Sequence, residues 1–218
     1  MLCYNTFILF YLHMRVFDMR DGPIRLGISG GTFDPVHYGH LIIAERAREE
    51  YNLDRVIFIP SGTPPHKDVS RITPAEHRYN MVCIATASNP YFQVSRIELE
   101  RQGYSYTIET LSRLRDSLDE GVRLYFITGA DVISGILSWK DHQSIFEMCE
   151  FIVAIRPGYK KEETVRKIED LKSSYGAKIN IAEVPLIGIS STGIREHVRD
   201  KKSIRYLLPE GVESYIYK

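Results

Sequence analysis

The sequence lacks an excess of charge of either sign, since Lys plus Arg and Asp plus Glu each number 28 in 218 residues. A neutral protein has little general attraction for nucleic acid or for anionic membranes, so neither is expected as a partner. Cysteine is scarce: Cys3, Cys83 and Cys149 are widely spaced and form no CxxC pair. We therefore expect neither a disulfide framework nor a zinc site, and a reducing, cytoplasmic setting.

Long hydrophobic runs are also missing. The apolar stretch at residues 2–12 is too short to span a bilayer. It has neither a basic region before it nor a small-residue cleavage site after it, so it does not fit a signal peptide. The length of the chain suits one domain with a sizeable core.

Apolar and β-rich runs alternate with helix-forming segments along the chain. Strands are predicted at 24–28, 55–59, 91–94, 122–128, 151–155 and 179–184, and helices at 41–50, 74–87, 108–118, 160–175 and 210–217. This alternation predicts an α/β, Rossmann-like fold with an open, mostly parallel sheet and helices on both faces. Thr73-Pro74-Ala75-Glu76 predicts a capping box. Arg78, on the helix that follows, is expected to be solvated, and the alternative is that it reaches the site.

The most informative stretch is Gly30-Gly31-Thr32-Phe33-Asp34-Pro35-Val36-His37-Tyr38-Gly39-His40. It joins the first predicted strand to a helix through a tight glycine turn, a geometry that lets backbone amides approach a phosphate. His37 and His40 are three residues apart, so they share a helix face and can both donate to phosphate oxygens. The alternative is a plain turn with two solvated histidines.

This stretch resembles the signature of the HIGH-type nucleotidyltransferases, with His37-Tyr38-Gly39-His40 in the place of H-x-G-H. That superfamily includes nicotinate mononucleotide adenylyltransferases, pantetheine-phosphate adenylyltransferases, cytidylyltransferases and some aminoacyl-tRNA synthetases. The resemblance implies nucleotidyl transfer and leaves the substrate open. It assigns six residues to ATP, namely Gly30, Gly31, Thr32, Phe33, His37 and His40. It assigns Thr32 and Asp34 to the mononucleotide.

A second motif runs from Ile187 to Arg195. Hydroxyls, free amides and the positive end of a helix would together form an anion site there, which Arg195 can face from one turn further on. The segment resembles the I-S-S-T-x-I-R motif that holds ATP phosphates in adenylyltransferases. The residues carried over are Ile189, Ser190, Ser191, Thr192 and Arg195. Ordinary N-capping beside an exposed arginine is the alternative.

The loop Pro60–Lys67 follows the second predicted strand, at the edge where open α/β sheets bind ligands. Its prolines limit the freedom of His66 and Lys67. The loop resembles the P-P-H-K segment of nicotinate mononucleotide adenylyltransferases. That resemblance assigns Ser61, His66 and Lys67 to the mononucleotide, whereas the alternative is a surface turn with a solvated lysine.

Three later segments extend the resemblance. Tyr106 and Thr107 belong to an S-Y-T segment that borders the pyridine nucleotide in this family. Gly129 and Asp131 match its G-x-D, where an acid at a strand end suits ribose hydroxyls. Trp139 is the only tryptophan and corresponds to the one that stacks on the nicotinate ring. The alternative for Tyr106 and Thr107 is packing, that for Asp131 is helix N-capping, and that for Trp139 is a position in the core.

These segments occur in family order, and the chain is identified as a member of the bacterial-type nicotinate mononucleotide adenylyltransferases. The family transfers the adenylyl group of ATP to nicotinate mononucleotide, giving deamido-NAD and pyrophosphate in NAD biosynthesis. His37, His40, Lys67 and Arg195 are the expected catalytic residues. The nucleophile is a phosphate that is already anionic near neutral pH, so no general base is needed. Mg²⁺ is expected to arrive with ATP, and no protein residue is assigned as a metal ligand.

The other possibilities are a nicotinamide mononucleotide or pantetheine-phosphate adenylyltransferase, a cytidylyltransferase, or a nucleotide-binding regulator without turnover. No dedicated cation for the nicotinate carboxylate is evident near Thr107 or Trp139. Enzymes of this kind start close to the first strand, so residues 1–22 are interpreted as an extension that need not be native. An added strand or a dimer contact is the competing view. Residues 23–218 are expected to form the single domain, with a homo-oligomer as an open option.

Overall fold

The computed structural model describes residues 22–155, 161–185 and 188–218. Its strands are β1 (Arg25–Gly31), β2 (Arg55–Pro60), β3 (Phe92–Val94), β4 (Arg123–Gly129), β5 (Glu150–Ile155) and β6 (Ile179–Glu183). They form one sheet in the order β3-β2-β1-β4-β5-β6, and every neighbouring pair is parallel. The predicted α/β, Rossmann-like fold is confirmed.

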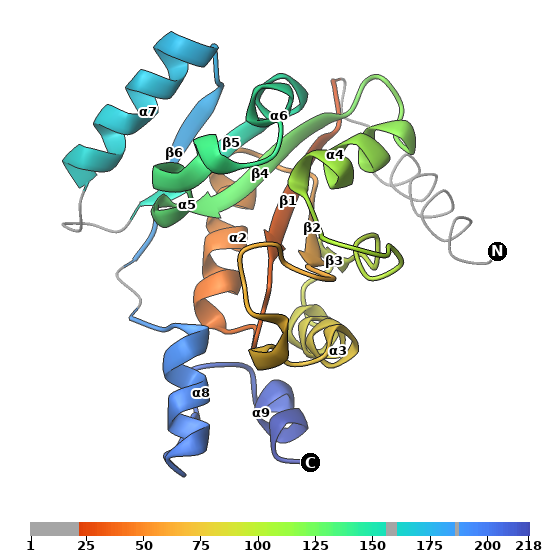
Figure 1. Cartoon of the computed structure of the whole chain (residues 1–218), viewed down its shortest axis with the longest axis vertical. Coiled ribbons are helices and arrows are strands. Elements are labelled where there is room, and N and C mark those ends of the chain that lie inside the picture. Colours follow the sequence, from red (N-terminus) through yellow and green to blue (C-terminus); the bar gives the residue numbers. More distant parts are fainter. Residues whose placement is uncertain (1–21, 156–160, 186–187) are drawn as a thin grey trace.

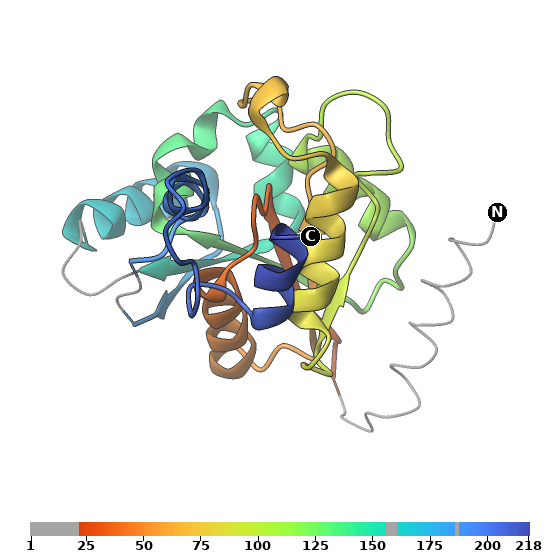
Figure 2. The same cartoon turned by 90° about the horizontal axis from the view of Figure 1, so that it is seen from below.

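Helices cover both faces of this sheet (Figures 1 and 2). Their bounds are α2 (Tyr38–Glu50), α3 (Ala75–Thr86), α4 (Thr107–Asp116), α5 (Ala130–Gly135), α6 (His142–Met148), α7 (Lys161–Tyr175), α8 (Ser191–Arg199) and α9 (Glu210–Ile216), with short 3-10 helices η1 (Val69–Arg71) and η2 (Ile136–Ser138). Within the described ranges, none of these helices has the length and apolar character needed to cross a membrane.

Two hydrophobic cores lie on opposite faces of the sheet, as the alternation of side chains along a strand requires. In β4, Leu124 and Phe126 belong to the core under α4, α5, α6 and α7, whereas Tyr125 and Ile127 belong to the core under α2, α3, α8 and α9. All four are buried. Burial on both faces explains why the strands read as continuous apolar runs in the sequence.

The strand order reverses direction between β1 and β4, because the chain moves outward from β1 to β3 and then returns to the other side. In open α/β sheets the carboxyl ends at this switch point form a crevice in which ligands bind. The ends of β1 and β4 carry Gly30-Gly31-Thr32 and Thr128-Gly129. The fold therefore places the predicted motifs at the expected binding edge.

Two local predictions need correction. Gly30 and Gly31 are the last residues of β1 rather than a turn. They are needed because a Cβ at either would press on a phenylalanine ring, that of Phe126 or Phe33. The capping box at Thr73 is absent, since α3 begins at Ala75 with Pro74 in the N-cap position and no side-chain cap. Glu76 instead pairs with Arg96.

Helices α5 and α6 are additions that the sequence did not predict. They lie between β4 and β5, where the predictions stopped at Asp131 and Trp139. Both are short, at 6 and 7 residues, and so give little periodic signal. Residues 1–21, nearly all of the predicted extension, and Ile187 of the second motif lie outside the described residues.

Candidate active site

The two histidines of the H-x-G-H stretch stand together at the start of α2. His37 is the N-cap residue, and its backbone N–H donates to Nδ1 of His40 over 3.2 Å. The two rings stack with their centroids 3.8 Å apart. A Cβ at Gly39 would lie only 3.0 Å from the His37 ring, so glycine between the histidines allows this packing.

The environment of His40 keeps its imidazole neutral. Burial, followed by the neighbouring His37 and Lys67, lowers the pKa of His40 to about 3. Because Nδ1 accepts the backbone N–H of His37, the proton of a neutral ring resides on Nε2. The edge of the Phe33 ring fixes its orientation, with centroids 5.0 Å apart. His40 can therefore offer one oriented N–H donor to an anion.

The second motif meets the first, although more than 150 residues separate them. Ser191 Oγ donates to the carbonyl of Pro35 over 2.9 Å, and Arg195 Nη1 donates to the carbonyl of Asp34 over 2.6 Å. Ser190 caps α8 by accepting the N–H of Gly193. The start of α8 is thus anchored beside the loop that carries the histidines.

Lys67 and Arg195 surround a buried carboxylate. Asp34 is 5 % exposed, and its Oδ2 lies 3.9 Å from Arg195 Nη1. Partial desolvation and the charge of Arg195 lower the pKa of Lys67, an effect that Asp34 opposes. The cations thus outnumber the acid at this point, which favours binding of a polyanion.

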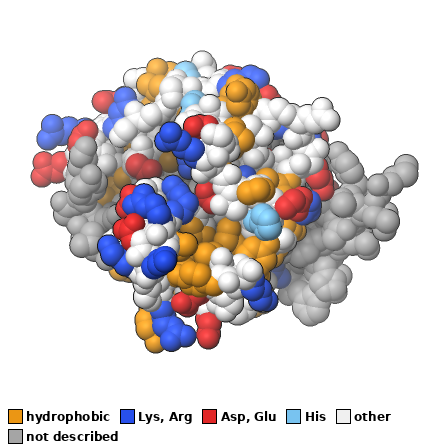
Figure 3. Space-filling model, turned by 60° about the horizontal axis from the view of Figure 1, so that its bottom comes forward, with side chains coloured by type: hydrophobic (Ala, Val, Ile, Leu, Met, Phe, Trp, Pro, Cys, Tyr) orange, Lys and Arg blue, Asp and Glu red, His pale blue; other side chains and the backbone are white. Residues whose placement is uncertain are grey.

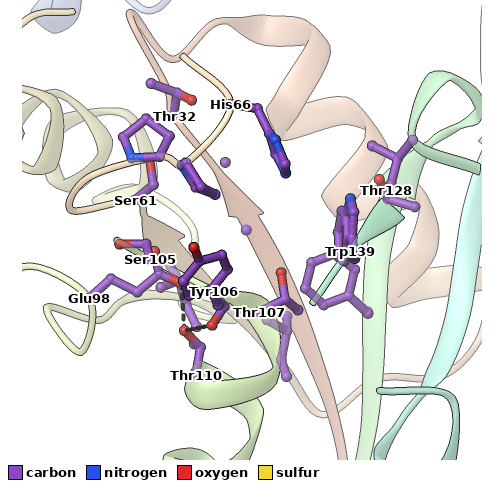
Figure 4. Close-up of a pocket in the computed structure, with 18 of the residues that line it drawn as sticks. Thr32, Ser61, His66, Glu98, Ser105, Tyr106, Thr107, Thr110, Thr128 and Trp139 are labelled. Carbon is purple, nitrogen blue, oxygen red and sulfur yellow. Dashed lines mark hydrogen bonds between the residues drawn. The ribbon is translucent and has the colours of Figure 1, made fainter. Parts of the chain in front are cut away.

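A cavity of about 300 Å³ opens at the carboxyl edge of the sheet (Figure 4). It contains seven of the eight residues assigned to the mononucleotide: Thr32, Ser61, His66, Lys67, Tyr106, Thr107 and Trp139. Asp34, the eighth, lies outside its lining. Gly30, Gly31 and Thr128, from the ends of β1 and β4, complete the floor. In Figure 4, Trp139 and Thr128 lie across the cavity from Ser61, Ser105 and Glu98.

The cavity lining does not include the two histidines of the H-x-G-H stretch, His37 and His40, nor Gly129, Asp131 or Arg195. Gly129 ends β4 and is the N-cap residue of α5, so Asp131 lies in the first turn of that helix and is not itself the cap. The Asp131 side chain folds back over Gly129. The predicted residues therefore fall into two groups, those that line the cavity and those of the cationic area beside it.

Trp139 combines packing with a place in the cavity. Its ring meets Phe126 edge-on, with centroids 5.7 Å apart. The adjacent Lys140 also lines the cavity, and its ammonium lies 4.5 Å from the centre of the Tyr106 ring and 2.8 Å from Glu109 Oε1. The sequence indicated no cation on this side because the partners of Lys140 come from a different helix.

Arg78 is the clearest error of the sequence interpretation. It was expected to be solvated, but it is 1 % exposed. Its guanidinium donates to the carbonyls of Thr73, Thr32, Ser61 and Gly62. These acceptors lie in three different loops, so no local sequence signal could have indicated them.

Glu98 and Ser105 were also missed, although both line the cavity. Glu98 Oε1 accepts the hydroxyl of Thr110 over 2.7 Å. Burial raises the pKa of Glu98, against the opposing effects of its hydroxyl donors and of Arg101. Ser105 Oγ accepts the N–H groups of Gly62 and Thr63. Glu98 follows the short edge strand β3 in a loop without a recognisable pattern.

The described residues contain no group of three or more His, Cys, Asp or Glu side chains arranged to hold a metal ion. The nearest acid, Asp34, already accepts the N–H of Thr73 and faces Arg195. Hard cations such as Mg²⁺ prefer several oxygen ligands.

Lys and Arg side chains gather beside a hydrophobic area on the face seen in Figure 3. A parallel sheet with this strand order, two histidines at a helix start and a second helix start anchored beside them defines a nucleotide-binding α/β protein with a site suited to phosphoryl transfer. This is the class that fold and site define together.

Comparison with known proteins gives the family. The model of the cytidylyltransferase-like family matches residues 28–197. A relative from Moorella thermoacetica, named "Probable nicotinate-nucleotide adenylyltransferase", is 52 % identical over 194 residues, 89 % of each chain. Another of that name, from a Thermoanaerobacter strain, is 49 % identical over 198 residues, covering 91 % of this chain and 94 % of its own. The chain belongs to the nicotinate-nucleotide adenylyltransferase family.

A solved structure supports the fold. The nicotinic acid mononucleotide adenylyltransferase of Plasmodium falciparum, complexed with NaAD, superposes with a TM-score of 0.72. The match covers 89 % of this chain and 95 % of the other, at 20 % sequence identity. At that identity the likeness concerns the arrangement of the sheet and helices.

Proposed function

We propose that this protein transfers the adenylyl group of ATP to nicotinate mononucleotide, producing deamido-NAD and pyrophosphate. The observation that carries the proposal is the contact between the two motifs, through Ser191 to Pro35 and Arg195 to Asp34, beside a cavity of about 300 Å³. One side of the site is cationic and the other is lined by Trp139 and Tyr106. A triphosphate and a pyridine ring need these two environments.

On the ATP side, His37 and His40 stabilise the α-phosphate region. The Nε2–H of a neutral His40 is an oriented donor that needs no rearrangement as charge develops in the transition state. Arg195 and the start of α8, with Ser190, Ser191 and Thr192, hold the β- and γ-phosphates. Gly30, Gly31, Thr32, Phe33 and Ile189 border the nucleotide, and Gly129 and Asp131 suit its ribose.

On the mononucleotide side, Trp139 stacks on the pyridine ring, with Tyr106 and Thr107 beside it. Ser61, His66 and Lys67 bind the phosphate, and Thr32 and Asp34 lie between the two substrates. Lys140 supplies a cation on the aromatic side, where a nicotinate carboxylate would be attracted and a neutral nicotinamide would not. We therefore favour the acid over the amide as substrate.

The reaction needs alignment and charge stabilisation more than proton transfer. The mononucleotide phosphate attacks the α-phosphorus of ATP, a P–O bond forms, and the bond to pyrophosphate breaks. The nucleophile is an anion at neutral pH, so no general base is assigned. Magnesium would be held by the oxygens of ATP and by water, and it would supply positive charge against the leaving pyrophosphate.

We also propose that residues 23–218 form one nucleotidyltransferase domain that acts on small molecules and not on nucleic acid. A cytoplasmic location fits the free thiols Cys83 and Cys149. A homo-oligomer stays a prediction, as does the interpretation of residues 1–22 as an extension.

The test is pyrophosphate release from ATP in the presence of nicotinate mononucleotide, nicotinamide mononucleotide or phosphopantetheine, at matched ATP and Mg²⁺. We expect turnover with the nicotinate compound to exceed that with either alternative by at least tenfold. Equal turnover with the nicotinamide compound would remove the assigned preference. Release with none of them, in protein that binds ATP, would favour a regulator without turnover.

A further inference from the structure

Arg78 is a buried cation that has no carboxylate in hydrogen-bond contact among the described residues. Its Nε donates to Thr73 O over 2.8 Å, and its Nη1 donates to Thr32 O over 2.7 Å. Its Nη2 donates to Ser61 O at 2.6 Å and to Gly62 O at 3.1 Å. One side chain on α3 therefore joins the loops that follow β1 and β2 to the start of its own helix.

The opposite side of the turn after β2 is fixed by hydrogen bonds to Ser105. Ser105 Oγ accepts the N–H groups of Gly62 at 3.1 Å and Thr63 at 3.2 Å, and Ser105 N–H donates to Thr63 O at 2.8 Å. Gly62 also lies so close to the Glu98 carbonyl that a Cβ could not be accommodated. The carbonyls of Ser61 and Gly62 thus accept from Arg78, whereas the amides of Gly62 and Thr63 and the carbonyl of Thr63 bond to Ser105.

The groups that this arrangement orients face the ligand cavity. Thr32 and Ser61 both line it, and the same loop continues to His66 and Lys67. The hydroxyl oxygen of Ser61 is buried and has no hydrogen-bond partner in the described part of the chain. A buried hydroxyl without a partner is costly unless a ligand completes it.

Burying a guanidinium is costly, and here hydrogen bonds to four backbone carbonyls offset that cost. An apolar side chain would leave those carbonyls unpaired, so Arg78 stabilises the loops as well as spacing them. Only a planar fork of donors can hold carbonyls from three loops at fixed spacing. Arg78 therefore contributes geometry as well as stability.

We propose that Arg78 is a positioning residue, which fixes the spacing between the ends of β1 and β2 so that Thr32, Ser61 and Lys67 meet the phosphate of the mononucleotide together. The inference rests on the proposed function, because it assumes that this cavity holds the mononucleotide. Among the described residues, none of the hydrogen bonds of Arg78 reaches the start of α8, so its influence should fall on the mononucleotide and on turnover more than on ATP binding.

The chain offers a matched control in Arg115. This arginine, on α4, also holds backbone carbonyls of two other segments, those of Val122 and Met148, each at 2.8 Å. It is not among the residues that line the cavity. Arg115→Lys therefore removes a comparable bridge without touching the site.

The experiment compares Arg78→Lys and Arg115→Lys with the parent protein, at a temperature where all three are folded. For Arg78→Lys we expect kcat/KM for the mononucleotide to fall at least 30-fold while KM for ATP changes less than threefold. Arg115→Lys should lose thermal stability but keep both constants within threefold. Added methylguanidinium should restore part of the activity of Arg78→Ala and none of any loss in Arg115→Ala.

Two outcomes would overturn the proposal: unchanged mononucleotide constants in Arg78→Lys, or parallel losses for both substrates that merely follow the melting temperature. Failure of the proposed function is recognised separately, because the parent protein would then show no turnover of the mononucleotide. In that case hydrogen exchange at the amides of Gly62 and Thr63 still tests whether Arg78 holds the turn after β2 in place. Exchange in Arg78→Lys should be at least tenfold faster than in Arg115→Lys, and equal rates would refute the positioning role.

Discussion

Arg78 and Arg195 provide an instructive comparison, because both lie on helices and both donate to carbonyls of the loop that follows β1. Arg78 binds Thr32 O and is 1 % exposed, whereas the Arg195 side chain binds Asp34 O and is 45 % exposed. Each guanidinium nitrogen of the buried Arg78 donates to a backbone carbonyl. The exposed Arg195 keeps N–H groups with which it can bind an anion.

The same contrast separates the two halves of the site. The half that we propose for the mononucleotide is a cavity whose walls are joined by Arg78, Ser105 and Glu98. The half that we propose for the triphosphate has the exposed Arg195 at its edge, beside the buried Asp34 and the neutral His40, and Lys67 lies where the two halves meet. A rigid wall suits a substrate that must be recognised by shape, and an open cationic edge suits one whose pyrophosphate must leave.

The largest expected effect is the fall in kcat on replacing His40, which we assign to the triphosphate side of the site. Replacing it with alanine removes an oriented donor to the reacting phosphate, which typically costs about 10²–10⁴-fold in kcat. Steady-state rates of pyrophosphate release measure it. His77→Gln, an exposed position on α3, is the control and should keep the parent rate. A kcat within threefold of the parent would take His40 out of the catalytic group.

Arg195→Gln tests the comparison directly. It should raise KM for ATP about 10- to 100-fold, as expected when hydrogen bonds to a charged group are lost. Because Arg195 is half exposed, the melting temperature should change by less than about 2 °C. Arg78→Gln should instead lower it by roughly 5–10 °C, since it leaves buried carbonyls unpaired. Equal thermal losses for the two variants would mean that the distinction between them is wrong.

Trp139→Ala tests the cavity that we propose for the mononucleotide. Loss of a stacking platform is worth about 1–3 kcal/mol for a nucleic-acid base, so KM for the mononucleotide should rise roughly tenfold or more. KM for ATP should stay within threefold. Equal increases for both substrates, with a fall in stability, would assign Trp139 to packing against Phe126 alone.

The contrast between the two arginines also marks what a sequence can predict. Apolar runs of four to seven residues predicted the six strands, with every boundary within three residues, because burial on both faces of a parallel sheet makes the runs continuous. The residues of the two phosphate motifs were identified through a family resemblance. Their contact across more than 150 residues then follows from the order of the strands.

The walls of the cavity could not be predicted in this way. Arg78 and Arg195 look alike in sequence, and what separates them is the position of carbonyls 16, 17 and 46 residues away from Arg78. Glu98 and Lys140 become cavity residues only when α4 packs beside the carboxyl ends of the strands. Exposure and partner are properties of the fold, so residue type and spacing do not contain them.

The smallest expected effect concerns the stability of the ligand-free protein between pH 7 and pH 5. The folded state holds the pKa of His40 at about 3, against 6.5 when exposed. Below pH 6.5 the unfolded chain therefore binds a proton that the folded chain refuses, and this contribution to stability is lost progressively as the pH falls toward 3. At pH 5 the loss amounts to about 2 kcal/mol, or roughly 5 °C in melting temperature.

His40→Gln should melt with a correspondingly smaller difference between pH 7 and pH 5, whereas His77→Gln should follow the parent protein. Saturating ATP should also reduce the difference in the parent, because an anion at His40 Nε2 favours the protonated ring. If the parent and His40→Gln lose the same number of degrees, His40 is not the buried neutral donor on which the triphosphate side of the site depends.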